Sequence, residues 1–461
     1  MNDYAAISTV DGWPGGLGAL CLSELLSALS HALDATEGQP AGHAIRVTLI
    51  GVEIGHRLGL RGVERRDLFY SLLLKDLGCS SNAARICELY LANDQLFKQA
   101  FKMVDGTTRS ALRFLVRETA KGDSTIRRAR TLISVIRNAG PIVDDLIETR
   151  CTQGASIARK MGFSQRVALG IHALDEHWDG SGRPERLSGD TIPLGSRIAL
   201  VAQVADVFLA SGGLDNAVEE IASRRGTWFD PQVADVAISV LKDPAMLRRL
   251  ADPHLDRLVL SQAAAVESTQ LDEAKMDRII EGFSQVIDAK SPFTNNHSRR
   301  VAGYVDAMTG VLGYDDARRR WMRRSALLHD IGKLGVPNRI LDKPAKLDDD
   351  ERAVIETHPT IGKVILQKIG IFGRVALLAE SHHERLDGKG YPNGLTADRI
   401  SLDVRVLTVA DIFDALSAER PYKAALPPDK VAEIMTGMIG TAIDGHCYEA
   451  LQHGLDIGSS T

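Results

Sequence analysis

The stretch His329-Asp330-Ile331-Gly332-Lys333 dominates the interpretation of this chain, together with the His382-His383-Glu384 and Asp387-Gly388-Lys389-Gly390-Tyr391-Pro392 stretches that begin 53 residues downstream. A His-Asp pair followed by a His-His pair is typical of a metal site, because imidazoles and carboxylates both bind divalent ions. Such residues can hold two ions close together. Two ions suit phosphodiester hydrolysis, since one activates a water and both stabilise the phosphoryl oxygens.

The hydrophobic pattern around these motifs is helical. Apolar residues recur at spacings of three and four, as in Leu25-Leu26-Leu29-Leu33 and Val364-Ile365-Ile369. Strict alternation over the length of a strand is rare, and Pro and Gly lie mainly between the periodic segments. The sequence therefore predicts an all-α fold.

Four short blocks occur twice in the same order. Residues 71–78 (SLLLKDLG) match 325–332 (SALLHDIG) at an offset of 254, and 178–184 (WDGSGRP) match 386–392 (LDGKGYP) at an offset of 208. The other two pairs are 43–47 with 297–301 and 226–230 with 440–444. Repeated order predicts tandem copies of one helical domain.

These offsets divide the chain. We expect an N-terminal helical segment over 1–40 and a degenerate copy over 41–245. A helical connector over 246–291 then leads to a complete copy over 292–455. The fall in offset implies 46 extra residues in the first copy, which we assign to an insertion around 85–137.

Composition restricts the function classes. The chain has 461 residues, is 44% hydrophobic and carries a net charge of −5, so it has no general attraction for nucleic acid or an anionic membrane. No apolar run approaches the ~20 residues of a membrane span, and the first residues lack the pattern of a signal peptide. We expect a cytoplasmic protein. The five cysteines form no Cys-x-x-Cys, which argues against a disulfide framework or zinc knuckle.

Seven residues of the second copy are candidate metal ligands, including five of the chain's thirteen histidines. Their types favour Fe, Mn, Ni or Zn over Mg or Ca. Each alone has an ordinary structural explanation, but the complete set favours a metal site. The candidates are His297, His329, Asp330, His358, His382, His383 and Asp411.

Local geometry suggests roles around these ligands. On a helix, His329 and Asp330 would diverge by about 100°, so one could bind a single ion while the other bridges two. Lys333 would share their face and could present its ammonium group to a phosphate. Asp414 lies one turn after Asp411 and could orient a ligand.

Two cations follow the segment that carries Asp411. That helix should end before Pro421, because the residue preceding a proline disfavours helical geometry. Arg420 and Lys423 would flank this end and could clamp phosphate. Alone, each would be read as a solvated charge.

These motifs resemble the HD-GYP family, a branch of the HD-domain metal-dependent phosphohydrolases, over residues 292–451. Asn296-His297, Thr357-His358-Pro359 and Asp411-x-x-Asp414 complete the pattern. The resemblance implies that all seven candidates are metal ligands and that Asp330 bridges two divalent ions, with Fe or Mn favoured and Ni or Zn as alternatives. It implies catalytic roles for Asp330 and Lys333, and substrate contacts from Lys333, Arg420 and Lys423.

The same resemblance implies a substrate and a product. It suggests that a hydroxide activated by two metal ions hydrolyses cyclic di-GMP to linear pGpG, and in some members to GMP. One departure bears on the metals. Some members use a Glu four residues before the first ligand His to hold a third ion, and this chain has Phe293 there. We therefore expect two ions.

The first copy lacks most of this site. Register places Lys75 at the position of His329 and Arg150 at that of His358. Leu174, Asp175 and Gln203 occupy three further ligand positions, and only His43 and Asp76 survive. Because fixed cations repel a metal ion, this copy should not be a hydrolase. Lys75 and Arg150 could replace the ions by pairing with Asp76 or with a bound phosphate.

Two alternatives stay open. The chain could hydrolyse another nucleotide, such as a mixed cyclic dinucleotide or a nucleoside phosphate. It could instead be a cyclic-dinucleotide-binding scaffold with negligible turnover. The chain could form a homodimer or bind a signalling protein in each of these cases.

Overall fold

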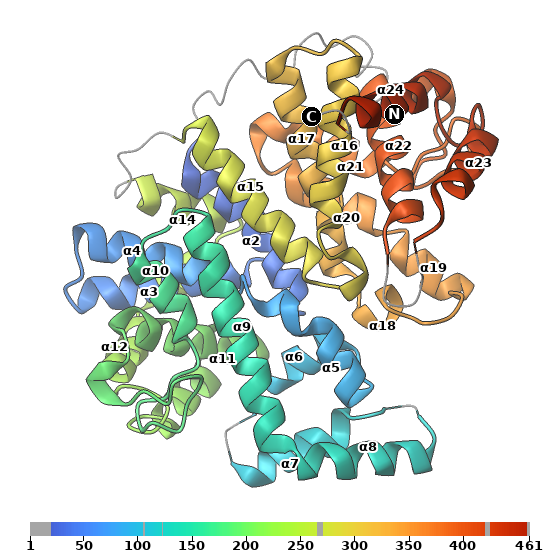
Figure 1. Cartoon of the computed structure of the whole chain (residues 1–461). Helices are drawn as coiled ribbons and strands as arrows, with labels where there is room; N and C mark the ends of the chain where they lie inside the picture. Colours follow the sequence, from blue (N-terminus) through green and yellow to red (C-terminus); the bar gives the residue numbers. More distant parts are fainter. Residues whose placement is uncertain (1–19, 105–106, 122, 265–270, 420–424, 459–461) are drawn as a thin grey trace. The chain divides into compact units, whose positions relative to one another are not determined.

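The computed structural model of the chain describes residues 20–104, 107–121, 123–264, 271–419 and 425–458 (Figure 1). Helices are the regular elements throughout these residues, and the isolated β-bridges in them build no sheet. The prediction of an all-α fold is confirmed. The chain divides into two compact units, one built from Cys21–Leu271 with Pro337–Arg339, the other from Asp272–Val336 and the residues from Ile340 onward.

The N-terminal unit is a bundle around the apolar helices α3 and α11. Helix α3 packs against α2, α4, α11, α12 and α14, so its buried face is covered on several sides. The helices outside the expected insertion are α2 (Leu22–Thr36), α3 (His43–Arg57), α4 (Gly62–Leu73), α9 (Ala139–Lys160), α10 (Gln165–His172), α11 (Leu194–Ser223), α12 (Pro231–Leu241), α13 (Pro244–Leu250) and α14 (Leu255–Ala264).

Helix α11 differs from one expectation. Its length and hydropathy would suffice to cross a membrane, although the sequence pattern suggested that no apolar run is long enough. In the bundle, 61% of its most apolar window is buried by other parts of the chain. A central helix of a packed bundle has this character, so these properties alone are weak evidence for a span.

The expected insertion folds as a small cluster of its own. It contains α5 (Ala83–Tyr90), α6 (Asp94–Phe101), α7 (Thr108–Glu118) and α8 (Thr125–Arg137). Phe97 and Phe114 form its centre, with ring centroids 4.8 Å apart. Ile86, Tyr90 and Val135 join the same buried cluster. Figure 1 shows α7 and α8 together at the far end of this segment, beyond α5 and α6.

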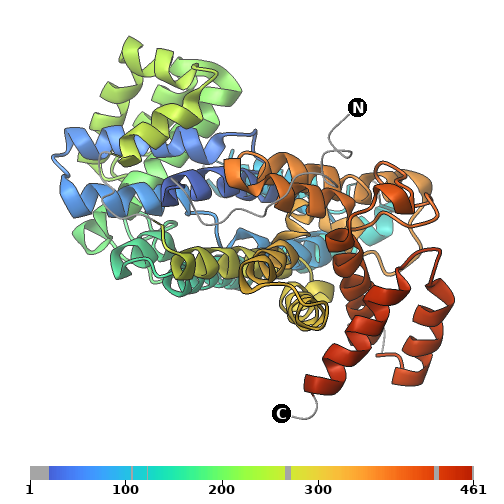
Figure 2. The same ribbon diagram turned by 90° about the horizontal axis from the view of Figure 1, so that it is seen from above.

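The C-terminal unit is a second bundle, centred on α16. This helix packs against α15, α17, α22 and α24, while α20 packs against α21. Figures 1 and 2 show α22, α23 and α24 grouped at one end of the unit. Its helices are α15 (Glu273–Asp288), α16 (His297–Val311), α17 (Asp316–Leu328), α18 (Asn338–Leu341), α19 (Asp349–Ile355), α20 (His358–Leu366), α21 (Gly373–Ser381), α22 (Leu402–Ser417), α23 (Pro428–Met438) and α24 (Gly445–Gly458).

The His329-Asp330 pair lies at a break between two helices. Helix α17 ends at Leu328, and a 3-10 turn, η4 (Ile331–Gly335), follows Asp330. Gly332 brings this turn against α20, where an added Cβ would lie 1.9 Å from the carbonyl oxygen of His358. Because a backbone atom cannot move aside without its helix, the close approach requires glycine.

We expect Gly332→Ala to destabilise the C-terminal unit by at least about 2 kcal/mol, since overpacking against α20 must displace the helix. The shift in the urea midpoint of unfolding measures this effect. Gly303→Ala is the matched control, because Gly303 lies in α16 and an added Cβ there meets nothing within 4 Å. That change should be neutral or stabilise by about 0.5–1 kcal/mol. Equal effects of the two substitutions would contradict the packing argument.

Candidate metal centre

Helix ends position six of the seven candidate ligands, and the interior of a helix positions the seventh. His297 begins α16, His329 follows α17, Asp330 precedes η4 and His358 begins α20. His382 and His383 follow α21, and Asp411 lies within α22. All seven side chains converge in the C-terminal unit. The expectation that His329 and Asp330 lie on one continuous helix is wrong, because α17 ends at Leu328 and a 3-10 turn begins at Ile331.

Asp330 occupies the middle of the group. Its Oδ2 lies 3.5 Å from His297 Nε2 and 3.4 Å from His329 Nε2. Its Oδ1 lies 3.4 Å from His358 Nε2 and 3.7 Å from His382 Nε2. The two oxygens of one carboxylate thus face two different pairs of imidazoles.

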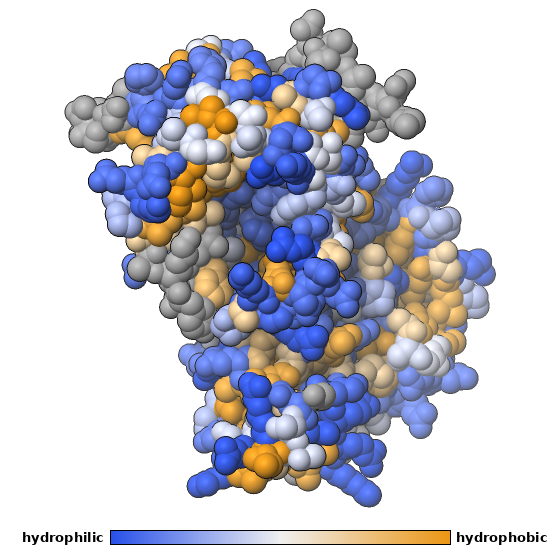
Figure 3. Space-filling view, turned by 90° about the vertical axis from the view of Figure 1, so that its right-hand side faces the viewer, coloured by the Kyte–Doolittle hydropathy of each residue, from blue (hydrophilic) through white to orange (hydrophobic). Residues whose placement is uncertain are grey.

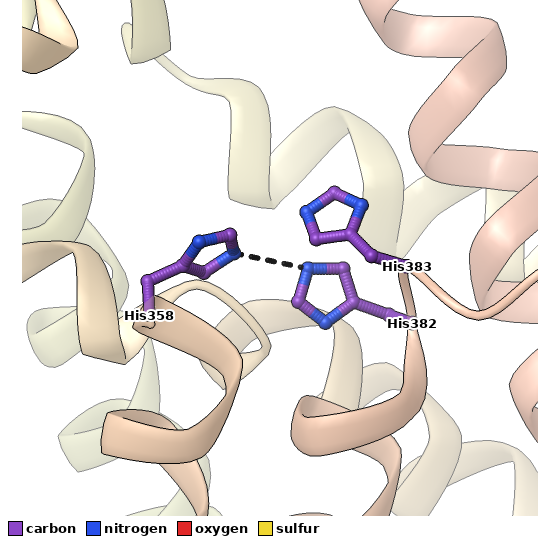
Figure 4. Close-up of side chains that lie close together, drawn as sticks. All are labelled: His358, His382 and His383. Carbon is purple, nitrogen blue, oxygen red and sulfur yellow. Dashed lines mark hydrogen bonds between the residues drawn. The ribbon is translucent and has the colours of Figure 1, made fainter. Parts of the chain in front are cut away.

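Asp411 and His383 extend the two sides. Asp411 Oδ1 lies 3.3 Å from His297 Nε2 and 3.9 Å from His329 Nε2. Ligand atoms of His358, His382 and His383 come within 4.8 Å of one another. Figure 4 shows these three rings gathered from α20 and the end of α21, with 3.4 Å between the Nε2 atoms of His358 and His382.

Backbone carbonyls orient three of the imidazoles. The Nδ1 atoms of His329, His358 and His382 each lie 2.7 Å from the carbonyl oxygen three residues earlier. Since a carbonyl only accepts, each Nδ1 carries the proton, and a neutral ring then has a lone pair on Nε2. Three such lone pairs therefore face the centre.

The donor set fits divalent cations. Among the described residues, neither His329 Nε2 nor Asp330 Oδ1 has a hydrogen-bond partner of good geometry, although both are buried. Nitrogen lone pairs beside carboxylate oxygens repel each other unless a cation lies between them. Buried polar atoms are rarely left in this state without an ion or water.

The protonation states of several of these side chains also favour metal binding. Burial lowers the pKa of His329 to about 4 and that of His383 well below its usual value, so both are neutral near pH 7. Although burial opposes it, the interaction with His329 and the positive charge of Lys333 hold the pKa of Asp330 well below its usual value. Neutral imidazoles and ionised carboxylates are the metal-binding forms. His297 differs, because Asp330, Asp411 and Asp414 outweigh its burial and raise its pKa.

Asp414 links the centre to an arginine that sequence reasoning missed. Its Oδ2 lies 2.7 Å from His297 Nδ1, while Arg300 donates from Nε and Nη2 to its two oxygens at 2.6 and 2.9 Å. Asp414 is fully buried, so these contacts fix its orientation. The spacing of His297 and Arg300 by three residues on α16 was the available signal.

The Gly-Tyr-Pro loop closes one side of the centre. Glu384 is buried and accepts hydrogen bonds from the backbone N–H groups of Asn393 and Leu395 at 2.7 and 2.8 Å. This anchor places the Tyr391 ring on His383, with centroids 4.7 Å apart and planes inclined by 29°. Tyr391 thus packs against a candidate ligand.

The structure describes only one of the three residues that are expected to contact phosphate. Lys333 Nζ lies 2.5 Å from Asp330 Oδ2, and its side chain is partly exposed. The lysine therefore has the predicted proximity, although it reaches Asp330 across a 3-10 turn and not along an α-helix. Arg420 and Lys423 lie outside the described residues.

The N-terminal unit repeats two sets of contacts that the C-terminal unit makes. His43 Nδ1 lies 2.7 Å from Asp206, which Arg46 also contacts, as His297 and Arg300 contact Asp414. Gly78 approaches the carbonyl oxygen of Arg150 as closely as Gly332 approaches that of His358. The register that pairs Arg150 with His358 therefore describes the packing of both units.

Ion pairs fill the corresponding position in that unit. Lys75 is buried, pairs with Asp76 and lies 3.2 Å from His43 Nε2. Arg150 pairs with Asp175. The first pairing was predicted. The expectation that Arg150 pairs with Asp76 is corrected, because its partner is Asp175, from the position of His383. Pairing of Lys75 or Arg150 with a bound phosphate stays a prediction.

A nearby acidic group does not make a second metal site. Glu37, Asp76 and Cys79 have ligand atoms within 4.8 Å of one another. However, Lys98 and Lys102 lie 3.5 and 2.9 Å from Glu37, and Lys75 holds Asp76. These ammonium groups already neutralise the carboxylates and would repel a cation.

Known proteins resemble the chain, one of them over nearly its whole length. The family model of the HD domain matches residues 132–233 and 281–447. The 3′3′-cGAMP-specific phosphodiesterase 3 of Vibrio cholerae is 49% identical over 95% of each chain. A cyclic di-GMP phosphodiesterase response regulator of Xanthomonas campestris is 34% identical over 43% of this chain and 52% of its own.

A solved structure agrees with these matches. The crystal structure of a cyclic GMP-AMP specific phosphodiesterase of V. cholerae has a TM-score of 0.64 and 44% identity, and the match covers 95% of this chain and 99% of that one. Both units therefore have counterparts in the same relative.

Proposed function

The chain belongs to the HD-domain phosphohydrolases of HD-GYP type and is a metal-dependent cyclic dinucleotide phosphodiesterase, and from this premise we propose that its substrate is 3′3′-cGAMP. The main support for this substrate is the 49% identity, over 95% of both chains, to a relative named for 3′3′-cGAMP. Motif resemblance alone had pointed to cyclic di-GMP. This relative instead favours the mixed cyclic dinucleotide.

We propose that Asp330 bridges two ions. His297, His329 and Asp411 would hold one ion, and His358, His382 and His383 would hold the other, with Asp330 between the two groups. The distances from the two oxygens to separate pairs of Nε2 atoms support this division. Phe293, in the place of a third-metal ligand, supports two ions and not three. Fe or Mn is favoured, with Ni or Zn as alternatives.

The ions would supply an activated water and neutralise phosphoryl charge. The chain's own residues hold the other parts in place. The backbone carbonyls direct Nε2 atoms inward, and Lys333 places a positive charge beside Asp330, where it can meet a phosphoryl oxygen. Arg420 and Lys423 stay proposed as further phosphate contacts.

We propose that the N-terminal unit is a degenerate copy without hydrolase activity. The shared His-Asp-Arg contact and the shared Gly approach support common descent, and the family match in residues 132–233 is consistent with it. Lys75 and Arg150 in ligand positions support the loss of metal binding.

Substrate profiling tests the proposed substrate. Protein purified without oxygen and supplied with Mn²⁺ or Fe²⁺ is assayed on 3′3′-cGAMP, cyclic di-GMP and cyclic di-AMP. We expect kcat/KM for 3′3′-cGAMP to exceed the others by at least about tenfold, equivalent to ~1.4 kcal/mol of transition-state binding. A preference for cyclic di-GMP would contradict the proposal, and negligible turnover of all three would favour a binding scaffold.

A second experiment addresses Arg300 as a positioning residue. Arg300→Met should weaken Mn²⁺ activation by about 10–100-fold, because Asp414 would no longer hold His297 firmly. The readout is the Mn²⁺ concentration for half-maximal activity of metal-depleted protein. Arg46→Met is the matched control, since Arg46 makes the same contact with Asp206 in the N-terminal unit. A purely structural role would make the two variants behave alike.

A further inference from the structure

The α5–α8 segment exposes an unusual share of apolar surface. Of the sixteen large hydrophobic side chains exposed among the described residues, eight lie between positions 96 and 136. The segment nevertheless has its own buried cluster, so these residues are not an incomplete core. Their exposure therefore indicates a surface that another molecule covers.

Helix α8 turns opposite faces to the core and to solvent. Val135 is only 2% exposed and packs in the buried cluster, whereas Ile126 and Ile133 are 68% and 59% exposed. The two isoleucines are seven residues apart, so they share a face, and Val135 lies about half a turn away. Arg130 and Arg137 are exposed on the isoleucine side.

Helix α7 has the same arrangement. Phe114 is buried in the cluster, while Leu112 and Val116 are each 46% exposed on the other side. Arg109 and Arg113 are exposed beside them. Figure 3 shows apolar surface among hydrophilic surface at its lower end, over these helices.

The charge of these helices opposes that of the whole chain. Residues 107–137 contain eight Lys or Arg and two Asp or Glu, while the chain carries −5. The net charge of the chain therefore does not reveal this local basic region. The expectation of no attraction to an anionic membrane follows from the net charge alone, so it does not apply to these helices. Exposed aliphatic residues flanked by arginines are the pattern of helices that lie in the interface of an anionic bilayer.

We propose that the outward faces of α7 and α8 bind an anionic phospholipid surface. The arginines would meet the lipid headgroups, and Ile126, Ile133, Leu112 and Val116 would enter the acyl boundary. Each basic residue near such a surface adds to the attraction, and buried aliphatic side chains make binding persist as salt screens the charges. A reversible peripheral contact is compatible with the predicted cytoplasmic location.

Co-sedimentation of the full chain with vesicles tests this proposal. One preparation is pure phosphatidylcholine, and in the other roughly a third of the lipid is phosphatidylglycerol. The variant combines Ile126→Gln, Arg130→Gln and Ile133→Gln. The matched control combines Val63→Gln, Arg166→Gln and Leu169→Gln, which removes the same charge and similar apolar surface at exposed sites outside the segment.

We expect wild type and control to bind the anionic vesicles and the variant to partition at least about tenfold less. None should bind pure phosphatidylcholine appreciably. Unchanged unfolding midpoints and phosphodiesterase rates would show that the variant is folded. The proposal fails if wild type ignores anionic vesicles, if the variant binds as well as the control, or if the variant instead dissociates a dimer of this chain without changing vesicle binding.

Discussion

Replacing Asp330 with asparagine should lower kcat/KM for the cyclic dinucleotide by at least about 10³-fold, because the proposed bridge between two ions loses its charge. A loss of only ~4 kcal/mol of transition-state stabilisation produces this effect, and metal ions supply several kcal/mol. Steady-state rates with Mn²⁺ measure it. The amide would also place a donor among imidazoles that need a cation between them.

Asp349→Asn is the matched control for that substitution. Asp349 is exposed in the first turn of α19, and its replacement removes the same charge from the same unit. Its rate should stay within about twofold of wild type. If Asp330→Asn retained both its metal and its rate, a bridging role for this carboxylate would be wrong.

Replacing Lys75 with methionine should destabilise the N-terminal unit by about 3–5 kcal/mol, since it leaves a buried carboxylate without its partner. Asp76 is 1% exposed, and despite its burial Lys75 lowers its pKa. The unfolding transition of the N-terminal unit should move to lower denaturant concentration. Adding Asp76→Asn should restore much of the loss, because no unpaired charge then remains.

Lys121→Met is the control for Lys75→Met, because Lys121 is exposed. It should change the free energy of unfolding by less than about 0.5 kcal/mol. If Lys75→Met left the free energy of unfolding unchanged, the ion pair between Lys75 and Asp76 would not stabilise the N-terminal unit. Metal binding by the N-terminal unit of the wild type would contradict the proposed exchange of ions for cationic side chains.

Most of the ligand set was accessible from the sequence because all its members except Asp411 lie in short motifs at helix ends. His382 and His383 are adjacent, and the break after Leu328 keeps His329 and Asp330 next to each other. Their spacing did not reveal the break itself. The break accompanies the close approach of Gly332 to α20, which joins residues far apart in the chain.

The network behind the ligands was less accessible. Arg300 and Asp414 are 114 residues apart, and only the packing of α16 on α22 joins them. The equivalent Asp206 has no metal-ligand motif beside it in the first copy, so the sequence offers no direct sign of its contacts with His43 and Arg46. Likewise, Arg150 could be placed in register, but the choice of Asp175 over Asp76 depends on side-chain directions within the bundle.

Metal content per chain, measured together with hydrolysis of 3′3′-cGAMP on protein purified without oxygen, tests the central claim most directly. Two equivalents of divalent metal per active chain are predicted, with activity rising as the second equivalent binds, and Asp330→Asn should lose both metal and activity. A wild-type protein that is fully active with one equivalent or none would contradict the two-metal centre around Asp330.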